Sequence, residues 1–384
     1  MIQLKGKYNF ANIFIDEVEE TAQQQIRNFL NHPAFANTYI AIMPDTHAGI
    51  GAVIGLTMKM NNYIIPNIVG VDLGCGIDTY NLGKIDIKYK ELDKFIRENI
   101  PVGFNKHKES KFTMGSYGNF ELVEIVNNTN QDEDDVYRKL GTLGGGNHFI
   151  EIDQDPEGNK WLTIHSGSRN FGYKIASYHQ NKAKELMKKM FIGEAYKHLE
   201  FLPLEQGGWD YLRDMQIAQF YAERNRWGIA YLILENYFKL KLDKLESVKS
   251  IHNYVDLKNK IIRKGAISAQ EGERCIIPFN MRDGIAICKG KGNKAYNYSA
   301  PHGAGRVMSR TKAREVVKLE EFKETMKDVW TSSVNEHTLD EAPMVYKDKD
   351  LIIKNITDTV DIEFFMKPVY NFKDDTPKRR RRKK

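Results

Sequence analysis

Four of the ten histidines in this chain lie in glycine-rich segments, a context that suits contact with a ligand better than core packing. The segments are residues 45–49 (DTHAG), 144–148 (GGGNH), 165–169 (HSGSR) and 301–305 (PHGAG). Glycine leaves the backbone open, so a ligand can come close to a neighbouring imidazole. We therefore expect His47, His148, His165 and His302 to line one site, with no chemical step assigned to His47.

The strongest chemical fragment is residues 70–76 (GVDLGCG), where Asp72 and Cys75 stand three residues apart on a glycine-rich turn. A carboxylate and a thiolate can converge on a cation there without steric obstruction. A thiolate can also bridge two cations and reduce their mutual repulsion, which a neutral imidazole cannot do. Taken alone, Cys75 is more often a small buried residue, so its role depends on its surroundings.

Three histidines complete a set of metal ligands around this turn. His148 and His165 each end or follow a predicted strand beside small residues, and His252 lies in residues 250–254 (SIHNY). Together with Asp72 and Cys75 they could fill two metal sites if the cysteine bridges. Ligand softness and the Irving–Williams order favour zinc or copper over manganese, so the residues alone leave the metal open.

His302 has a different setting from the ligand histidines. Residues 301–306 (PHGAGR) combine an imidazole and a guanidinium with glycines whose backbone N–H groups can hold phosphate oxygens. His302 could therefore act as a nucleophile toward a phosphate that a metal polarises. The alternative is an ordinary glycine turn with a histidine that faces solvent.

The elements that would position these residues are short strands and a few long helices. Short β-branched runs cut by glycines predict buried strands over residues 38–80 and 266–310. Apolar spacing predicts helices over residues 9–30, 132–140, 173–191 and 209–238. Because neither a repeat nor a Pro/Ser-rich linker separates these blocks, we expect an α+β fold. It would form a single interwoven mixed-sheet domain over residues 1–373, with surface helices.

Composition limits the class of protein. With 41% hydrophobic and 28% charged residues, the chain is typical of soluble globular proteins. Apolar runs all fall short of the roughly 20 residues that span a bilayer. Residues 1–8 lack the apolar core of a signal peptide. We therefore expect a cytoplasmic protein with no membrane partner, and its three cysteines do not form a disulfide framework.

The net charge of +6 comes from the end of the chain. Residues 378–384 are seven consecutive lysines and arginines, and without them the formal charge is −1. Any attraction to phosphate elsewhere must therefore come from local clusters of cations. We expect residues 374–384 to form a disordered tail, either a solvated extension or a non-specific RNA anchor.

Together these segments resemble the RtcB family of RNA-splicing ligases. The matching motifs follow the family's order from about residue 40 to about residue 373, which makes the resemblance specific. They are residues 43–49 (MPDTHAG), 69–76 (VGVDLGCG), 143–151 (LGGGNHFIE), 164–169 (IHSGSR), 252–253 (HN), 263–266 (RKGA), 300–310 (APHGAGRVMSR) and 340–343 (DEAP).

The resemblance implies a GTP- and manganese-dependent ligase. Such an enzyme joins an RNA 3′-phosphate or 2′,3′-cyclic phosphate end to a 5′-hydroxyl end. His302 would attack the α-phosphate of GTP, forming histidine–GMP and releasing pyrophosphate. The guanylyl group would then pass to the RNA 3′-phosphate, and the 5′-hydroxyl would displace GMP.

The resemblance also assigns the metal ligands. One Mn²⁺ would be held by Asp72, Cys75 and His148. The other would be held by Cys75, His165 and His252, with the cysteine as the bridge.

The resemblance further implies a nucleotide pocket. Its expected residues are Asn147, His148, Phe149, Ile150, Glu151, His252, Asn253, Pro278, Phe279, Asn280, Met281, Ile285, Gly303, Ala304, Gly305 and Lys373. Four positions depart from the family pattern. Phe279 stands where a glycine is common, Asn280 and Ile285 stand where serines are common, and Asp374 follows Lys373 where a glycine is usual. These departures leave the metal ligands untouched and bear only on the choice of nucleotide.

Two other functions stay open at this point. One is a two-metal relative that binds RNA ends or hydrolyses cyclic phosphates without using His302, although the chain keeps His302 and all five ligands. The other is an RNA-binding module driven by the basic tail. The sequence does not identify the RNA, a splicing or a repair role, the oligomeric state or an activating protein partner.

Overall fold

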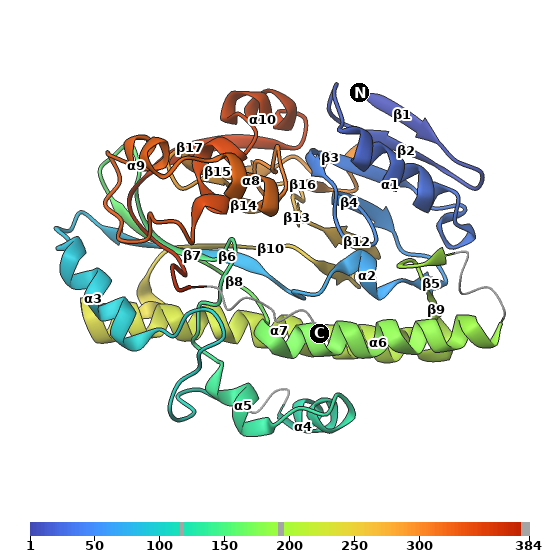
Figure 1. Ribbon diagram of the computed structural model, residues 1–384, viewed down its shortest axis with the longest axis horizontal. Helices are drawn as coiled ribbons and strands as arrows, with labels where there is room; N and C mark the ends of the chain where they lie inside the picture. The colour runs from blue at the N-terminus through green and yellow to red at the C-terminus, as the bar shows by residue number, and fades with distance from the viewer. Residues whose placement is uncertain (116–118, 191–195, 378–384) are drawn as a thin grey trace.

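The computed structural model of the chain describes residues 1–115, 119–190 and 196–377, and shows an α+β fold with mixed sheets, as predicted. Figure 1 shows the sheets as a middle layer, with two long helices below them and short helices above. Within the described ranges, no helix is both long and apolar enough to cross a membrane.

Two large sheets form this layer. The six-stranded sheet has the order β1 (Ile2–Lys5), β2 (Phe10–Ile13), β3 (Ile40–His47), β4 (Ile54–Lys59), β12 (Ile261–Lys264), β11 (Tyr254–Asp256). The seven-stranded sheet has the order β10 (Ser247–Ile251), β6 (Gly76–Gly83), β8 (Lys160–Ser166), β7 (Phe149–Gln154), β17 (Val360–Phe372), β15 (Gly284–Gly290), β14 (Arg274–Asn280). Two short pairs complete the strands: β13 (Ala266–Ser268) with β16 (Ser299–Pro301), and β5 (Tyr63–Ile64) with β9 (Leu202–Pro203).

Helices cover both faces of the layer (Figure 1). Those described are α1 (Glu20–Leu30), α2 (Pro66–Val69), α3 (Tyr89–Asn99), α4 (Asn119–Asn128), α5 (Glu133–Arg138), α6 (Arg169–Lys189), α7 (Trp209–Tyr231), α8 (Arg310–Val316), α9 (Leu319–Thr325) and α10 (Lys349–Ile356). Helix α7 continues as a π-helical turn over Leu232–Phe238. Tyr211, Met215 and Ile229 of α7 are buried in the main hydrophobic core.

The strand register gathers several strand ends at one place. Antiparallel pairing sets Gly76, the first residue of β6, opposite Ile251, the last residue of β10. It also sets Gly76 opposite Ser166, the last residue of β8. Strand β7 begins beside the same end of β8, with Phe149 opposite His165. Residues that directly precede β6 and β7, or that end β8 and β10, therefore lie together.

Two local predictions are wrong. Residues 10–13 fall in the predicted helix over 9–30 but form β2, and the helix begins only at Glu20. Pairing of β2 with both β1 and β3 overrides the helix-like apolar spacing. Pro66–Val69, within the predicted strands of residues 38–80, forms the short helix α2. Its proline favours the first helical turn, and Gly70, with φ of 99°, ends it.

Ordered contacts continue past residue 373. Arg97 donates hydrogen bonds of 3.1 and 2.9 Å to the carboxylate of Asp375, and Thr376 donates one of 2.6 Å to Asp374. Residues 378–384 of the predicted tail, like Phe191 at the end of the predicted helix over 173–191, lie outside the described residues. The division of the chain at residue 373 stays a prediction.

Helix α7 is tied to the seven-stranded sheet by a buried ion pair. Arg226 Nε donates to Asp78 Oδ1 on β6 over 2.7 Å, and both side chains are almost completely buried. Arg226 Nη1 also donates to the carbonyl oxygens of Gly74 and Ser166, over 3.0 and 3.1 Å. One guanidinium thus holds the turn before β6 and the end of β8 in fixed relation.

Replacing Arg226 with alanine should lower the free energy of unfolding by about 3–5 kcal/mol, because the Asp78 carboxylate would stay buried without its partner. Urea unfolding followed by far-UV circular dichroism measures the change. Adding Asp78→Asn to Arg226→Ala should restore part of the loss. Arg224→Ala, on a less buried position of the same helix, is the matched control. Equal free energies of unfolding for the Arg226→Ala and Arg224→Ala variants would contradict a structural role for the Arg226–Asp78 ion pair.

Candidate active site

The joined strand ends bring four predicted ligands together. Cys75 directly precedes β6 and His252 directly follows β10, so the pairing of these strands makes them neighbours. His148 directly precedes β7, and His165 is the second to last residue of β8. Asp72 joins them because the turn before Cys75 folds back, with Cys75 N–H donating to the Asp72 carbonyl over 3.3 Å.

The ligand atoms form two groups that share the cysteine. Cys75 Sγ lies 3.5 Å from His148 Nε2 and 3.3 Å from His165 Nε2. Asp72 Oδ2 lies 3.0 Å from His148 Nε2. We call Asp72, Cys75 and His148 the first metal group, and Cys75, His165 and His252 the second metal group. Within each group all ligand atoms lie within 4.8 Å of one another, as the predicted pairing of ligands requires.

The backbone orients two of the imidazoles. His148 Nδ1 lies 2.9 Å from the Leu143 carbonyl oxygen, and His165 Nδ1 lies 3.1 Å from that of Asn147. A carbonyl can only accept, so Nδ1 carries the proton and donates. Each Nε2 is then the nitrogen left for a metal, and it lies toward Cys75, which is the arrangement a metal needs.

Burial sets the protonation of the group. It lowers the pKa of His165 and of His252 well below the usual value, which keeps both imidazoles neutral and able to ligate. Burial also raises the pKa of the Cys75 thiol, and the Asp72 charge raises it further. Burial alone would raise the pKa of Asp72, but the hydrogen bond and charge of His148 outweigh it and lower that pKa to about 2. A thiolate at Cys75 therefore needs added positive charge, which metal cations supply.

A glycine is required beside the first metal group. A Cβ added to Gly167 would lie 2.1 Å from Asp72 Oδ1, so a larger residue would displace the carboxylate. That oxygen instead accepts the backbone N–H of Ser168 over 3.0 Å, which leaves Oδ2 facing the ligands. The glycine context that marked these segments in the sequence therefore has a steric cause.

Asn225 on α7 fastens the loops around the ligands. Its amide nitrogen donates to Ser166 Oγ and to the carbonyl oxygens of Thr142 and Gly167, over 2.9–3.1 Å. Its amide oxygen accepts the backbone N–H groups of Gly141 and Thr142 at 2.9 and 3.0 Å. Sequence reasoning treated this helix as core and missed Asn225. The available signal was the pair of adjacent polar residues, Asn225 and Arg226. They lie in a helix whose other buried residues are largely apolar.

His302 lies next to the second metal group and is oriented by a carboxylate. Its Nδ1 is 2.8 Å from Asp45 Oδ2 on β3, and Asp45 is completely buried. The ring centroids of His302 and His252 are 4.7 Å apart. An Nδ1–H donated to Asp45 leaves the Nε2 lone pair free for chemistry.

His47 has a supporting place in the same wall. Its Nδ1 lies 3.0 Å from the Asp45 carbonyl oxygen. Burial lowers the pKa of His47 to about 4, so the ring is neutral and lines the site without carrying charge.

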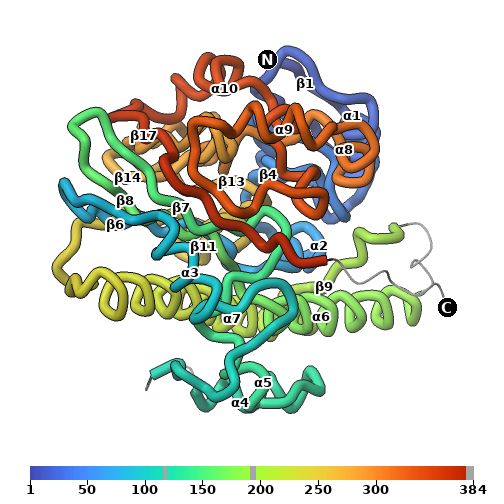
Figure 2. The backbone as a smooth tube through the Cα atoms, turned by 60° about the vertical axis from the view of Figure 1, so that its left-hand side comes forward, coloured from blue at the N-terminus to red at the C-terminus, as the bar shows by residue number. Residues whose placement is uncertain are grey.

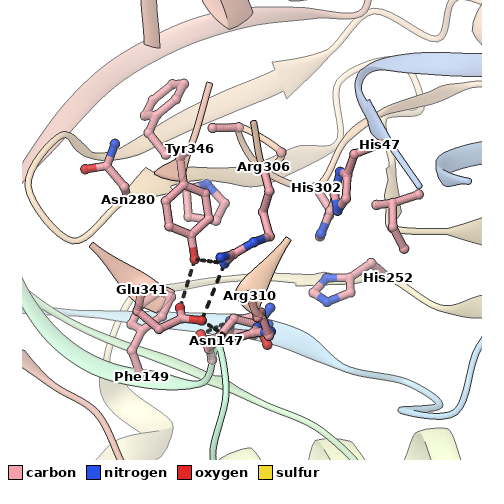
Figure 3. A pocket seen from close by; sticks show the side chains of 18 of the residues that line it. His47, Asn147, Phe149, His252, Asn280, His302, Arg306, Arg310, Glu341 and Tyr346 are labelled. Atoms are coloured by element: carbon pink, nitrogen blue, oxygen red, sulfur yellow. Dashed lines mark hydrogen bonds and ion pairs between the residues drawn. The ribbon is translucent and has the colours of Figure 1, made fainter. Parts of the chain in front are cut away.

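One cavity of about 1150 Å³ joins the metal groups, His302 and most of the predicted nucleotide residues. Figure 3 shows His47, His252 and His302 on one side of it and Asn147, Phe149 and Asn280 on the other. The predicted nucleotide residues that line it are Asn147, Phe149, Glu151, His252, Asn253, Pro278, Phe279, Asn280, Met281, Ile285, Gly303, Ala304, Gly305 and Lys373.

Two predicted nucleotide residues do not line this cavity. The side chain of Ile150 is completely buried in the main hydrophobic core, and its place in the nucleotide pocket stays a prediction. Successive residues of a strand point to opposite faces, so Phe149 and Glu151 face the cavity and Ile150 faces away. His148 lies behind the wall as part of the first metal group.

A cluster around Glu341 forms the wall opposite His302 (Figure 3). Lys373 Nζ lies 3.2 Å from the buried Glu341 carboxylate, Arg306 Nη1 lies 3.6 Å from it, and Arg310 pairs with it closely. The Tyr346 hydroxyl donates to it over 2.8 Å. Three cations around one carboxylate leave donors for a phosphate or for the nucleobase.

Sequence reasoning named Lys373 and the guanidinium of Arg306 but missed Arg310, Glu341 and Tyr346. Arg310 also pairs with Asp340 at 2.9 Å, as does Arg314 at 2.8 Å, so the cations still outnumber the carboxylates. Arg306, Arg310 and Glu341 lie in motifs that carried the family resemblance. The motifs are about thirty residues apart, and nothing in either one indicated that they would meet.

Glu151, which lines the cavity, lies close to a second buried acid, Asp153. Burial, and then the charge of Asp153, raise the pKa of Glu151 well above its usual value. Burial raises the pKa of Asp153 to about 6. Asn371 donates a short hydrogen bond to Glu151 from the neighbouring strand β17. Two carboxyl groups this close share a proton near neutral pH, so the pair carries less than two negative charges.

Comparison with known proteins places this site in a family. The family model described as "tRNA-splicing ligase RtcB" matches residues 25–374. The "RNA-splicing ligase RtcB" of Escherichia coli K12 is 32% identical, over 92% of this chain and 94% of the relative. The "tRNA-splicing ligase RtcB" proteins of Aeropyrum pernix and Methanococcus maripaludis are each 28% identical, over 82% and 91% of this chain and 83% and 90% of theirs. The chain belongs to the RtcB family, whose expected ligands it brings together in one cavity.

Proposed function

We propose that the protein is an RNA ligase that joins 3′-phosphate or 2′,3′-cyclic phosphate ends to 5′-hydroxyl ends, using GTP and two Mn²⁺ ions. The observation that carries the proposal is the position of His302, oriented by Asp45, beside two metal groups that share Cys75. The names of the relatives support the ligase activity in RNA splicing or repair.

The donor set fits two divalent cations. Cys75 belongs to both metal groups, and its thiol loses its proton only where positive charge offsets burial and the charge of Asp72. The neutral imidazoles and the free Asp72 Oδ2 supply the other ligands. When bound, the metals would polarise a phosphate and neutralise its developing charge.

His302 would carry the first chemical step. Its Nε2 lone pair forms a bond to the α-phosphorus of GTP, while the bond from that phosphorus to the pyrophosphate oxygen breaks and pyrophosphate leaves. The imidazole gains positive charge during the attack, and the buried Asp45 carboxylate stabilises that charge while it holds Nδ1–H.

The opposite wall would hold the nucleotide and the RNA phosphate. Arg306, Arg310 and Lys373 supply cationic donors, and Lys373 Nζ lies 5.4 Å from the centre of the Phe149 ring. Asn280, at one of the positions that depart from the family, donates to Asp283 over 2.7 Å and is already paired. We propose GTP as the nucleotide on the resemblance, with Glu151 and Lys373 at the base.

A relative that only binds RNA ends or hydrolyses cyclic phosphates is the second candidate. Neither activity needs a nucleophilic imidazole. The completely buried Asp45 that orients His302 has no purpose in that case, so the arrangement favours ligation.

Incubation with α-labelled GTP and Mn²⁺ should produce an acid-labile covalent label on the protein. His302→Ala should abolish the label because Nε2 is the nucleophile. Asp45→Asn should slow labelling roughly 100-fold or more, because the ring loses its orienting carboxylate. His337→Ala, an exposed histidine away from the cavity, is the matched control. Label on the His302 variant would show that the nucleophile is assigned wrongly.

Equilibrium binding of Mn²⁺ should reach two ions per chain, with the electron paramagnetic resonance signal of a coupled pair. Cys75→Ala should abolish the coupling and weaken at least one site, because the shared ligand is lost. Cys275→Ala, a buried cysteine outside both groups, should retain two ions. Two coupled ions in the Cys75 variant would exclude a cysteine bridge.

Deleting residues 378–384 should weaken RNA binding a few-fold at low salt and leave guanylylation intact. The seven charges attract phosphate without regard to sequence, and the proposed chemistry uses none of them. Filter binding over a range of salt and the GTP-labelling assay measure the two effects. Complete loss of labelling on truncation would contradict this division.

A further inference from the structure

Phe104 is an aromatic side chain that is 99% exposed, in the loop after α3. Isolated apolar residues on a surface are common, so exposure alone assigns nothing. Its position in the fold and its charged neighbours give it a role.

The residue before Phe104 is bonded to the loops of the first metal group. Gly103 N–H donates to the Gly144 carbonyl over 3.0 Å. The Gly103 carbonyl accepts from Arg169 Nη2 over 2.9 Å. Gly144 begins the segment that ends in His148, so the Phe104 loop is bonded to a segment that carries a ligand of the first metal group, and we call this side of the site the rim.

The order of the histidine rings separates this rim from the nucleotide. The centroid distances are 4.7 Å between His302 and His252, 5.3 Å between His252 and His165, and 5.2 Å between His165 and His148. His302 and the first metal group therefore lie at opposite ends of a row. In the ligation step the attacking and leaving oxygens must lie roughly in line. GMP leaves on the side of His302, so the 5′-hydroxyl strand has to enter over the first metal group.

The loop that carries Phe104 is cationic where it meets solvent. Lys108 and Lys111 are exposed and form no ion pair with any residue that the structure describes. Lys106 is paired with Asp135 at 2.5 Å, and Glu109 is the acidic residue between the two free lysines. Two free cations against one carboxylate suit a phosphodiester backbone.

The end of the described chain also reaches this loop, as Figure 2 shows. Asp374 Oδ2 would lie 3.0 Å from a Cβ added to Gly103. Thr376 donates to the other Asp374 oxygen, Oδ1, over 2.6 Å, so this carboxylate is partly compensated within the chain. It lies against the backbone of Gly103, on the stem of the loop.

We propose that Phe104 stacks against a nucleobase of the RNA strand that carries the 5′-hydroxyl end, and that Lys108 and Lys111 contact its phosphodiester backbone. An exposed aromatic face on the same loop as free cations suits single-stranded RNA, which proteins hold by stacking and backbone contacts without reading its sequence. The inference rests on the proposed function, because the position of His302 is what defines the side on which GMP leaves.

Fluorescence anisotropy tests it with a labelled RNA that has a 5′-hydroxyl and a blocked 3′ end, bound to the full chain with Mn²⁺. Phe104→Ala should weaken binding about tenfold, the effect of losing one stacked base. Phe120→Ala removes another exposed phenylalanine, on α4 with 81% exposure, and should change nothing. Phe104→Trp should keep the affinity, and its fluorescence should be quenched when this RNA binds.

The lysines give an independent readout. Replacing Lys108 and Lys111 with alanine should reduce the slope of log affinity against log salt by about 1.4, the value for two phosphate contacts on single-stranded RNA. An RNA with abasic 5′-terminal nucleotides should bind Phe104→Ala and the unchanged protein equally.

The GTP-labelling assay separates failure of this inference from failure of the proposed function. Phe104→Ala should form histidine–GMP at the normal rate, because the loop does not touch the nucleotide. If the unchanged protein takes no label, the proposed function fails. If it is labelled but Phe104→Ala binds the 5′-hydroxyl RNA normally, the stacking site is overturned. If Phe104→Ala weakens binding only of an RNA that has a 3′-phosphate end, the assignment to the 5′-hydroxyl strand is overturned.

Discussion

The burial of Cys75 between two sets of ligands is the constraint on which the rest of this structure depends. A thiol in that position keeps its proton, because burial and the Asp72 charge both raise its pKa. It becomes a bridging thiolate only if two cations share it, and they can share it only if both ligand sets lie within a few ångströms. The sheet meets that requirement with main-chain pairing: the joined ends of β6, β8, β7 and β10 place one cysteine and three histidines together.

Strand pairing alone does not fix loops, and helix α7 supplies what it lacks. Asp72, Cys75 and His148 all lie in the turns that lead into strands and not in the strands themselves. Arg226 and Asn225, adjacent on α7, bond to the backbone of these turns from below the sheet. The charge of Arg226 is balanced by Asp78 on β6, so the helix contributes donors to the turns without leaving an unpaired buried charge. Rigid support of this kind is what holds ligand atoms at distances that a metal tolerates.

The metal ligands and His302 could be predicted from the sequence, since glycine context and family motifs mark each of them locally. Relations between distant residues could not. Asp45 lies 257 positions from His302, and no local pattern connects a carboxylate in a buried strand to a histidine in a glycine turn. The same holds for Glu341 with Lys373. Ile150 was predicted as a nucleotide residue because it lies inside a motif, yet strand alternation turns it into the core. The strand β2 and the helix α2 were missed because tertiary pairing and a proline-initiated turn override local spacing.

The partner of Nδ1 explains why histidines in one cavity take different roles. In His148 and His165 that nitrogen donates to a backbone carbonyl, which is neutral and does little to stabilise an imidazolium. Nε2 of each ring is thereby the nitrogen left for a metal. In His302 the partner is the buried Asp45 carboxylate, which stabilises the positive charge that a bond to Nε2 would create. A nucleophilic imidazole acquires that charge when it bonds to phosphorus, whereas a ligand must avoid it. The sequence contains four glycine-flanked histidines of similar appearance, and the partner that folding gives Nδ1 distinguishes the proposed nucleophile from the proposed ligands among them.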